Sequence, residues 1–133
     1  MVIRRILAVV CVYAILFVPM VYGENSGKAI SVTASDFQFM PNALTVDAGQ
    51  EVSLSLINNS VQEHEWVLLK HGTEVVLPFN DDDEHKVYWE IEAGPGETKE
   101  ENFTAPSEPG VYSIVCGKPR HIERGMKATL VVR

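Results

Sequence analysis

Short runs of alternating apolar and polar residues cover the chain from residue 29 onward, and each run ends at a turn signal. In residues 52–57, apolar side chains at 52, 54 and 56 alternate with serines at 53 and 55, the pattern of a strand with one buried face. Comparable runs lie at residues 30–34, 37–39, 44–46, 64–69, 86–91, 97–104, 111–116 and 127–133. No stretch has sustained helical periodicity. We therefore predict an all-β domain, a Greek-key β-sandwich or closed barrel of seven to eight short strands.

Two regions between these runs need their own interpretation. Residues 70–84 show the least regular pattern, and their acidic run at 81–84 is interpreted as a solvated loop tip. Residues 86–91 and 97–104 flank Gly94-Pro95-Gly96, which predicts a hairpin around that turn.

The first 23 residues differ in character from the rest. Arg4 and Arg5 precede an apolar run over residues 6–21, and small or polar residues follow, which is the order of an export signal. The run is short for a membrane span, which needs about 20 residues. We predict a signal peptide at residues 1–23, with an uncleaved membrane anchor as the alternative, and one domain at residues 24–133. The domain would then be exported, periplasmic or otherwise extracytoplasmic.

Charge and cysteine content narrow the functional classes. The chain has a net charge of −7, and without Arg4 and Arg5 nine basic residues face eighteen acidic ones, a net charge of −9. This balance argues against nucleic-acid binding through a basic surface. Outside residues 1–23, Cys116 is the only cysteine. Because exported domains normally pair their cysteines, a single one is an inert buried thiol, an interchain disulfide or a metal ligand.

Further donor residues lie close to this cysteine. Cys116, His121 and Met126 share one loop between two predicted strands, with four residues between successive donors, and His64 opens a strand about fifty residues upstream. One thiolate, two imidazoles and a thioether suit one copper ion, because a His₂Cys site with a weak axial Met is the blue-copper arrangement used in electron transfer. We therefore predict these four as ligands of one ion that cycles between Cu(I) and Cu(II). Each residue alone also fits an ordinary core or surface role.

Strand parity is consistent with this grouping. If Cys116 faces the interior, Ile114 and Tyr112 do so as well, while Val115 faces the other way. On the last strand, Met126 would share its face with every second residue to position 132. The remaining histidines, His71 and His85, are interpreted as surface residues, and Met40 as a core or rim residue.

With these residues, the sequence resembles the cupredoxins, especially the auracyanin-, azurin- and plastocyanin-like blue copper proteins, over the whole of residues 24–133. Residues 64–69 are similar to the family's first-ligand strand, 94–97 to its mid-chain turn, 109–116 to its cysteine strand and 125–132 to its final strand. The resemblance implies an eight-stranded Greek-key sandwich with a mononuclear copper. It also implies ligand roles for His64, Cys116, His121 and Met126.

Two positions beside the ligands depart from the family pattern. Many members have Asn after the first His ligand and Ser or Thr after the Cys, and these two hydrogen-bond across the site. Here the positions hold Glu65 and Gly117, so the surroundings of the ligands must be built differently. We predict that a carboxylate at Glu65, if it faces the site, favours Cu(II) and lowers the reduction potential.

A third departure is Arg120, where the family usually has Gly before a solvent-facing second His. With Lys118, Arg124 and Lys127 it makes the loop of residues 116–126, here called the ligand loop, basic on an acidic protein. Pro119 and Ile122 would be the apolar remainder of this surface. We predict docking to an acidic face of a redox partner, such as an acidic cytochrome or a membrane electron-transfer complex.

Other functions stay open at this stage, although an enzyme is not expected. Four histidines are too few for a multicopper enzyme, and one cysteine in the loop does not suit a binuclear copper site. The alternatives are a periplasmic copper-binding or delivery protein, a non-blue site with Glu63 or Glu65 as a ligand, and a metal-free sandwich that binds a protein. We expect a monomer.

Overall fold

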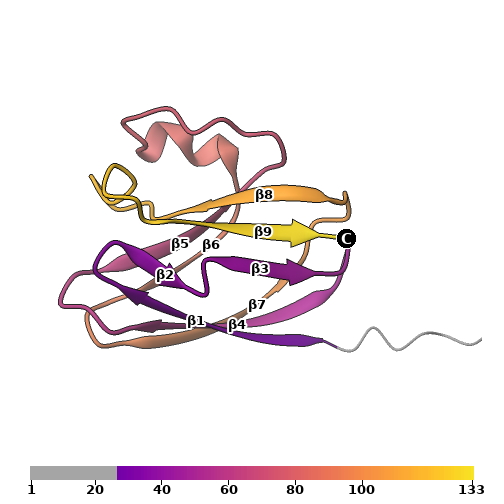
Figure 1. Cartoon of the computed structure of the whole chain (residues 1–133), viewed down its shortest axis with the longest axis horizontal. Helices are drawn as coiled ribbons and strands as arrows, with labels where there is room; N and C mark the ends of the chain where they lie inside the picture. The colour runs from indigo at the N-terminus through magenta and orange to yellow at the C-terminus, as the bar shows by residue number, and fades with distance from the viewer. Residues whose placement is uncertain (1–26) are drawn as a thin grey trace, which may run out of the picture.

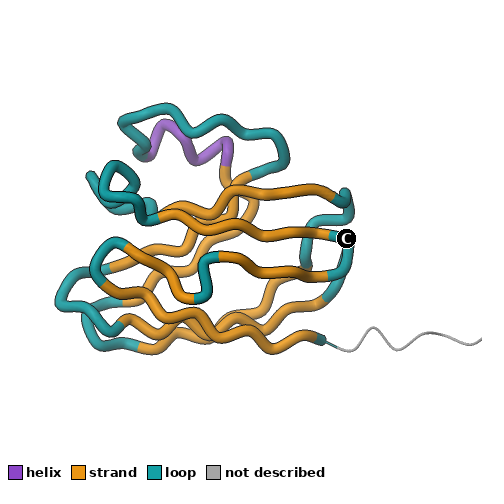
Figure 2. Tube along the Cα trace, in the orientation of Figure 1, coloured by secondary structure: helices purple, strands orange, loops and turns teal. Residues whose placement is uncertain are grey.

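In the computed structural model, residues 27–133 are described, so the predicted signal segment at residues 1–23 lies outside the described part. Nine strands and one short 3-10 helix make up the domain (Figures 1 and 2). The elements are β1 (Lys28–Ser35), β2 (Gln38–Met40), β3 (Ala43–Val46), β4 (Glu51–Asn58), β5 (His64–Leu69), η1 (Asp81–Lys86), β6 (Val87–Ala93), β7 (Thr98–Thr104), β8 (Gly110–Val115) and β9 (Lys127–Val132). Among residues 27–133, no helix has the length and apolar character that crossing a membrane requires.

The strands form two sheets that pack face to face. The first sheet has the order β2-β1-β4-β7, and the second has the order β3-β9-β8-β5-β6. The pairs β1–β4 and β3–β9 are parallel, and the other pairs are antiparallel. The all-β prediction is confirmed as a two-sheet sandwich. The described residues contain nine strands, one more than the upper predicted count of eight, and the two shortest, β2 and β3, pair with different sheets.

In the alternating runs, every second side chain lies between the two sheets. In β4, Val52, Leu54 and Leu56 are buried in this main core, as their spacing predicted. In β8, Tyr112 and Ile114 enter the same core, while Val115 belongs to a separate cluster on the other face. From Met126, directly before β9, to Val132 at its end, every second residue is in the main core. The predicted parity of both strands is therefore confirmed.

A second apolar cluster covers the outer face of the second sheet. It consists of Val67, Leu69, Val115 and Ile122, and Val75, Phe79 and Val87 pack against it. The last three come from residues 70–86, the β5–β6 connection, and from the start of β6. Figure 1 shows this connection and η1 above β8. This connection therefore serves as a cover for the sheet, although its sequence shows no regular period.

The acidic run at the end of this connection is a helical turn rather than the predicted loop tip. Asn80 caps η1, since its Oδ1 accepts the N–H of Asp82 at 2.8 Å while its own N–H donates to Asp83 Oδ2 at 3.1 Å. No residue of η1 is buried, so the predicted exposure of the run is confirmed.

The turn at residues 94–96 is present, but the hairpin predicted around it is wrong. β6 pairs with β5 in the second sheet, and β7 pairs with β4 in the first, so the turn crosses from one sheet to the other. At the crossing, Asn58 Nδ2 donates to the carbonyls of Ala93 and Gly94, both at 3.0 Å. These bonds satisfy backbone groups that a hairpin ladder would otherwise use.

Candidate metal centre

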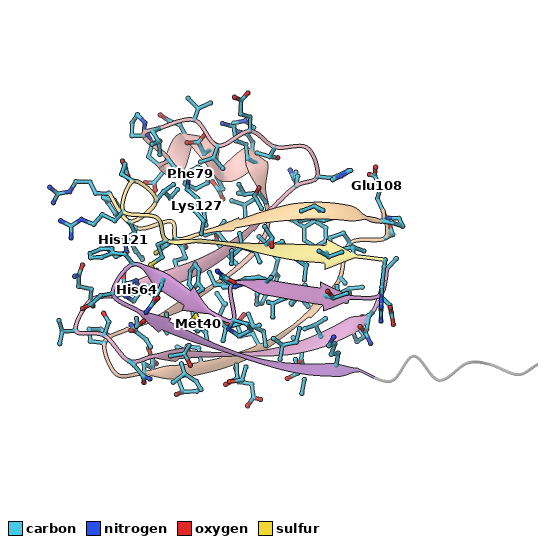
Figure 3. All side chains as sticks on the ribbon, viewed as in Figure 1. Met40, His64, Phe79, Glu108, His121 and Lys127 are labelled. Carbon is cyan, nitrogen blue, oxygen red and sulfur yellow. The ribbon has the colours of Figure 1, made fainter. Side chains whose placement is uncertain are left out.

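The four predicted ligands lie at one end of the sandwich. His64 is the first residue of β5, Cys116 directly follows β8, and Met126 directly precedes β9. His121 lies in the ligand loop between them, and Figure 3 shows it close to His64 at the same end of the molecule. His64, Cys116 and Met126 are fully buried, and His121 is 7% exposed.

Three of these residues bring metal-binding atoms together. Cys116 Sγ lies 3.3 Å from His121 Nδ1 and 3.9 Å from His64 Nδ1. One donor atom from each residue lies within 4.8 Å of the other two. Such a group of one sulfur and two imidazole nitrogens, closed off from water, fits a single copper ion.

Met126 is tied to the same residues through its backbone. Its carbonyl accepts the Cys116 N–H at 3.2 Å, and its own N–H donates to the His121 carbonyl at 3.1 Å. Its side chain is fully buried in the same main core as Cys116, and a thioether is the weak axial ligand that a His₂Cys copper site would take. Its role as a ligand stays a prediction.

Successive tight turns fold the ligand loop over the strand ends. The His121 N–H donates to the Lys118 carbonyl at 3.1 Å, and the Gly125 N–H donates to the Ile122 carbonyl at 2.9 Å. Gly125 has φ +93°, and Arg120 has φ +67°. The second value is in the left-handed region, which costs a residue with a side chain about 1 kcal/mol and explains why a glycine would suit position 120.

Hydrogen bonds orient both imidazole rings. His64 Nε2 is 3.0 Å from Ser60 Oγ, and His121 Nε2 is 3.2 Å from Gln62 Oε1. With Nε2 held in this way, Nδ1 of each ring faces the thiol. The sequence prediction missed Ser60 and Gln62, and the only available signal was their place in the polar turn directly before His64.

The environment favours the protonation states that a metal needs. Burial lowers the pKa of both His64 and His121, so the rings tend to be neutral and able to bind a cation. Burial raises the pKa of the Cys116 thiol, and the backbone N–H groups of Glu65, which donates to the sulfur at 3.5 Å, and of Lys118 oppose part of this shift. A bound cation would complete the stabilisation of the thiolate.

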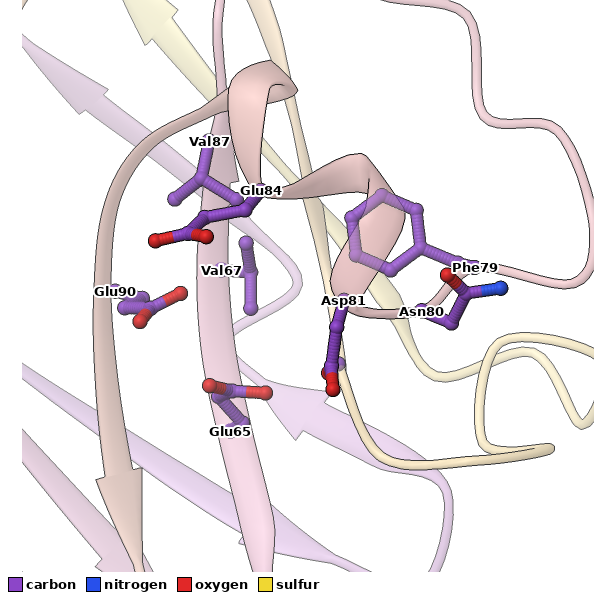
Figure 4. A pocket seen from close by; sticks show the side chains of 9 residues that line it. Glu65, Val67, Phe79, Asn80, Asp81, Glu84, Val87 and Glu90 are labelled. Atoms are coloured by element: carbon purple, nitrogen blue, oxygen red, sulfur yellow. The ribbon is translucent and has the colours of Figure 1, made fainter.

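Glu65 faces the outer side of the sheet rather than the donor cluster. Its half-buried carboxylate lies over Gly117, where an added Cβ would be only 2.0 Å from Glu65 Oε2. Burial raises the pKa of this carboxyl, and Lys118 opposes that shift. Figure 4 shows the side chain beside η1 and β6. It lines a cavity there with a volume of about 180 Å³. Among the described residues, the donor cluster includes neither Glu63 nor Glu65.

The surface around His121 differs from the prediction in three ways. Lys118 is paired with Glu63 and Glu92, so it does not add to a cationic ring. Ile122 is 3% exposed and packs in the outer cluster rather than on the surface. His121 itself is largely covered rather than solvent-facing.

Other residues take their place around this ring. Phe37 packs edge-on against the His121 ring at 5.1 Å, and the Arg124 guanidinium lies 4.4 Å above the Phe37 ring. These residues line a shallow hollow together with Gln62, Pro119 and Arg120. Two of the four predicted cations, Arg120 and Arg124, thus flank the second imidazole.

Residues 27–133 match the family described as copper binding proteins, plastocyanin/azurin family. Auracyanin-B of Chloroflexus aurantiacus is 28% identical over 130 residues, an alignment that covers 84% of this chain and 55% of that protein. The chain therefore spans about half the length of this relative. Auracyanin-A of the same bacterium is 33% identical over 121 residues, covering 77% of this chain and 72% of that protein.

The similarity extends to three dimensions. The solved structure of auracyanin A, described as a "blue" copper protein from Chloroflexus aurantiacus, superposes with a TM-score of 0.70 at 29% identity. The superposition covers 81% of this chain and the whole of that one.

Proposed function

Because the chain belongs to the plastocyanin/azurin family of copper-binding proteins, we propose that it is a small blue copper protein that carries single electrons between redox partners. In this proposal His64, Cys116 and His121 hold one copper ion, and Met126 is its weak axial ligand. The ion supplies a one-electron couple between Cu(I) and Cu(II).

The convergence of two oriented imidazole nitrogens on one buried thiol supports this proposal most directly. Ser60 and Gln62 orient the rings, and the Glu65 backbone N–H donates to the sulfur at 3.5 Å. A donor set built in this way can accept either oxidation state with little movement, which suits rapid electron transfer.

An electron carrier also fits better than an enzyme or a delivery protein. All four donor side chains are at least nine-tenths buried, which leaves a substrate no open position beside the ion. A protein that hands copper to another needs donors that a partner can reach. The burial therefore favours a site that keeps its ion and exchanges electrons.

The proposal is tested by adding Cu(II) to the purified protein. We expect an intense visible thiolate-to-copper band and reversible one-electron cycling by voltammetry. Cys116→Ser should abolish the band. His85→Gln removes an exposed histidine outside the cluster and should keep it. A colourless complex without redox cycling would exclude this function and favour a delivery or structural role.

We also propose that the His121 end docks to an acidic face of the redox partner. Arg120 and Arg124 support this, because both flank His121 on a chain whose net charge is −7. Electron transfer to an acidic cytochrome should then slow as salt increases from 10 to 300 mM, since ions screen such attraction. A rate independent of salt would contradict this docking mode.

Export is part of the same proposal and rests on the order of residues in positions 1–23. Protein expressed from the full chain should be recovered outside the cytoplasm, beginning at Glu24. Recovery of residue 1 in a membrane fraction would instead support the anchor.

A further inference from the structure

Lys118 connects the ligand loop to two other parts of the sandwich. Its Nζ lies 2.5 Å from Glu63 Oε1, directly before β5, and also contacts the carboxylate of Glu92 in β6. The Lys118 side chain is 22% exposed, compared with 48% for Lys99, whose pair with Glu97 lies on the surface. The Lys118 side chain is thus more covered than that of Lys99, although the side chains of Glu63 and Glu92 stay about half exposed, and it pairs with two carboxylates instead of one.

The surrounding charges stabilise the protonated form of Lys118. Burial alone would lower the pKa of Lys118, but the hydrogen bonds that it donates to Glu63 and Glu92 raise this pKa well above its ordinary value. The Glu65 carboxylate over Gly117 attracts the same cation. Two carboxylates therefore contact one ammonium and a third attracts it, and such a network holds its geometry better than an isolated exposed pair.

The backbone of Lys118 contacts two of the proposed ligands. Its N–H lies near enough to Cys116 Sγ to help lower the pKa of the thiol, and its carbonyl accepts the N–H of His121 at 3.1 Å. The position of this one peptide segment therefore affects both the sulfur and the second imidazole. Where the side chain is held, the two ligands are held as well.

We propose that Lys118 is a positioning residue, whose ion pairs with Glu63 and Glu92 keep the ligand loop in its metal-binding geometry. The ion pairs act through the peptide groups that contact Cys116 and His121, and the ammonium does not touch the ion. This inference rests on the proposed function. It adds a device that keeps the geometry alike in the two copper states and slows the loss of copper.

The central test is Lys118→Met, which keeps most of the aliphatic stem and removes the charge. In the copper-free protein, the His121 amide should exchange hydrogen about tenfold faster, as expected when a charge-assisted hydrogen bond that restrains the loop is lost. In the copper protein, transfer of Cu(I) to an excess of a chelator should accelerate by a similar factor, and the Cu(II) EPR hyperfine splitting should change. Lys99→Met is the matched control and should alter none of these.

Two further variants distinguish the loss of the Lys118 ion pairs from a general loss of folding. Lys118→Arg keeps the charge and should retain most of the wild-type behaviour. Glu63→Gln/Glu92→Gln should reproduce the effect of Lys118→Met, and the triple variant should be no worse than either, because all three residues act as one unit. If Lys118→Met itself fails to fold, the glutamine pair carries the same test.

The proposal is overturned if both Lys118→Met and the glutamine pair keep His121 exchange, copper release and the EPR signal within twofold of wild type. That result leaves the copper function intact, provided that the wild-type protein shows the blue band. A wild-type protein with no band and no redox cycling would overturn the proposed function instead. Faster exchange of the His121 amide hydrogen in copper-free Lys118→Met would then still show that the Lys118 ion pairs hold the ligand loop.

Discussion

The ligand loop and the β5–β6 connection lie against the same outer cluster but do different work. The ligand loop contributes Ile122 to it, and the connection contributes Val75 and Phe79. The ligand loop also carries the donors and two arginines, whereas the connection carries the acidic residues of η1. Two neighbouring loops of opposite charge thus divide chemistry and packing between them.

The comparison shows that a metal site need not depend on the segments that stabilise the fold around it. The donors come from the strand ends and from the ligand loop, none from the connection. The connection covers Val67 and Val115, which lie on the outer face next to donor-bearing strand ends. Changes in the connection should therefore alter stability, and changes in the ligand loop should alter the copper properties.

Phe79→Ala removes packing of the connection on the outer cluster, and we expect it to have the largest effect on stability. A fully buried phenylalanine costs 3–5 kcal/mol when truncated, so this half-buried one should lower the free energy of unfolding by about 2 kcal/mol. Urea titration measures the loss, and the blue band should stay in place. Val76→Ala, at a side chain that is 58% exposed, is the control and should change stability by less than about 0.5 kcal/mol. A shifted band with unchanged stability would show that the division is wrong.

Arg124→Glu should sharpen the electrostatic contrast between the two loops. The reversed charge lies beside Phe37 and His121, so association with an acidic partner at low salt should slow by about tenfold. Stopped-flow kinetics measures the rate. Glu84→Lys reverses a charge on η1 instead and should not slow association. Equal and opposite changes, with Glu84→Lys speeding association as much as Arg124→Glu slows it, would mean that the partner senses only net charge.

Glu65→Asn tests a residue of the cavity that lies between the ligand loop and the β5–β6 connection. The Glu65 carboxylate faces the cavity beside η1, but its charge still acts on the Cys116 thiol. Removing that charge should raise the reduction potential by about 40 mV, which corresponds to about 1 kcal/mol for a one-electron couple. Voltammetry at pH 7 measures it, with Glu90→Gln as the control on the far wall of the cavity. An unchanged potential would mean that solvent screens Glu65 from the ion.

Asp83→Asn should have the smallest effect, and only on the connection. A hydrogen bond from Lys86, at 2.7 Å, and the capping contact with Asn80 hold the pKa of Asp83 below its ordinary value. Because the folded pKa is depressed, this carboxylate stabilises the fold fully above pH 4 and loses its effect as pH falls through the folded pKa. The wild type should therefore be more stable than the variant at pH 7, and the difference should be smaller at pH 2. Thermal unfolding at both pH values measures it.

The sequence predicted the ligand loop better than the connection for physical reasons. Cys116, His121 and Met126 are rare residue types between two regular strands, and period-two alternation fixes which way Cys116 and Met126 point. In contrast, Val75 and Phe79 pack from a segment whose apolar residues have no regular spacing. The capping hydrogen bonds of η1 form only in the folded chain.

Other features were hidden for a related reason. The pairing of Lys118 with Glu63 and Glu92 requires that β5, β6 and the ligand loop meet, which no local pattern encodes. The burial of Ile122 depends on the same docking. The hairpin prediction around Gly94–Gly96 was wrong because strand partners are chosen across the sandwich, and the turn residues alone do not specify them.

Two opposing demands act on position 120, because its backbone is left-handed and its side chain is a cation beside His121. A glycine there would relax the backbone by about 1 kcal/mol, less the entropy that glycine adds to the unfolded chain. It would also remove one of the two cations beside His121. Selection for heat tolerance alone would tend to replace this arginine, and selection for partner discrimination would keep it. Position 120 is thus where directed evolution should reveal which of the two pressures acts on the protein.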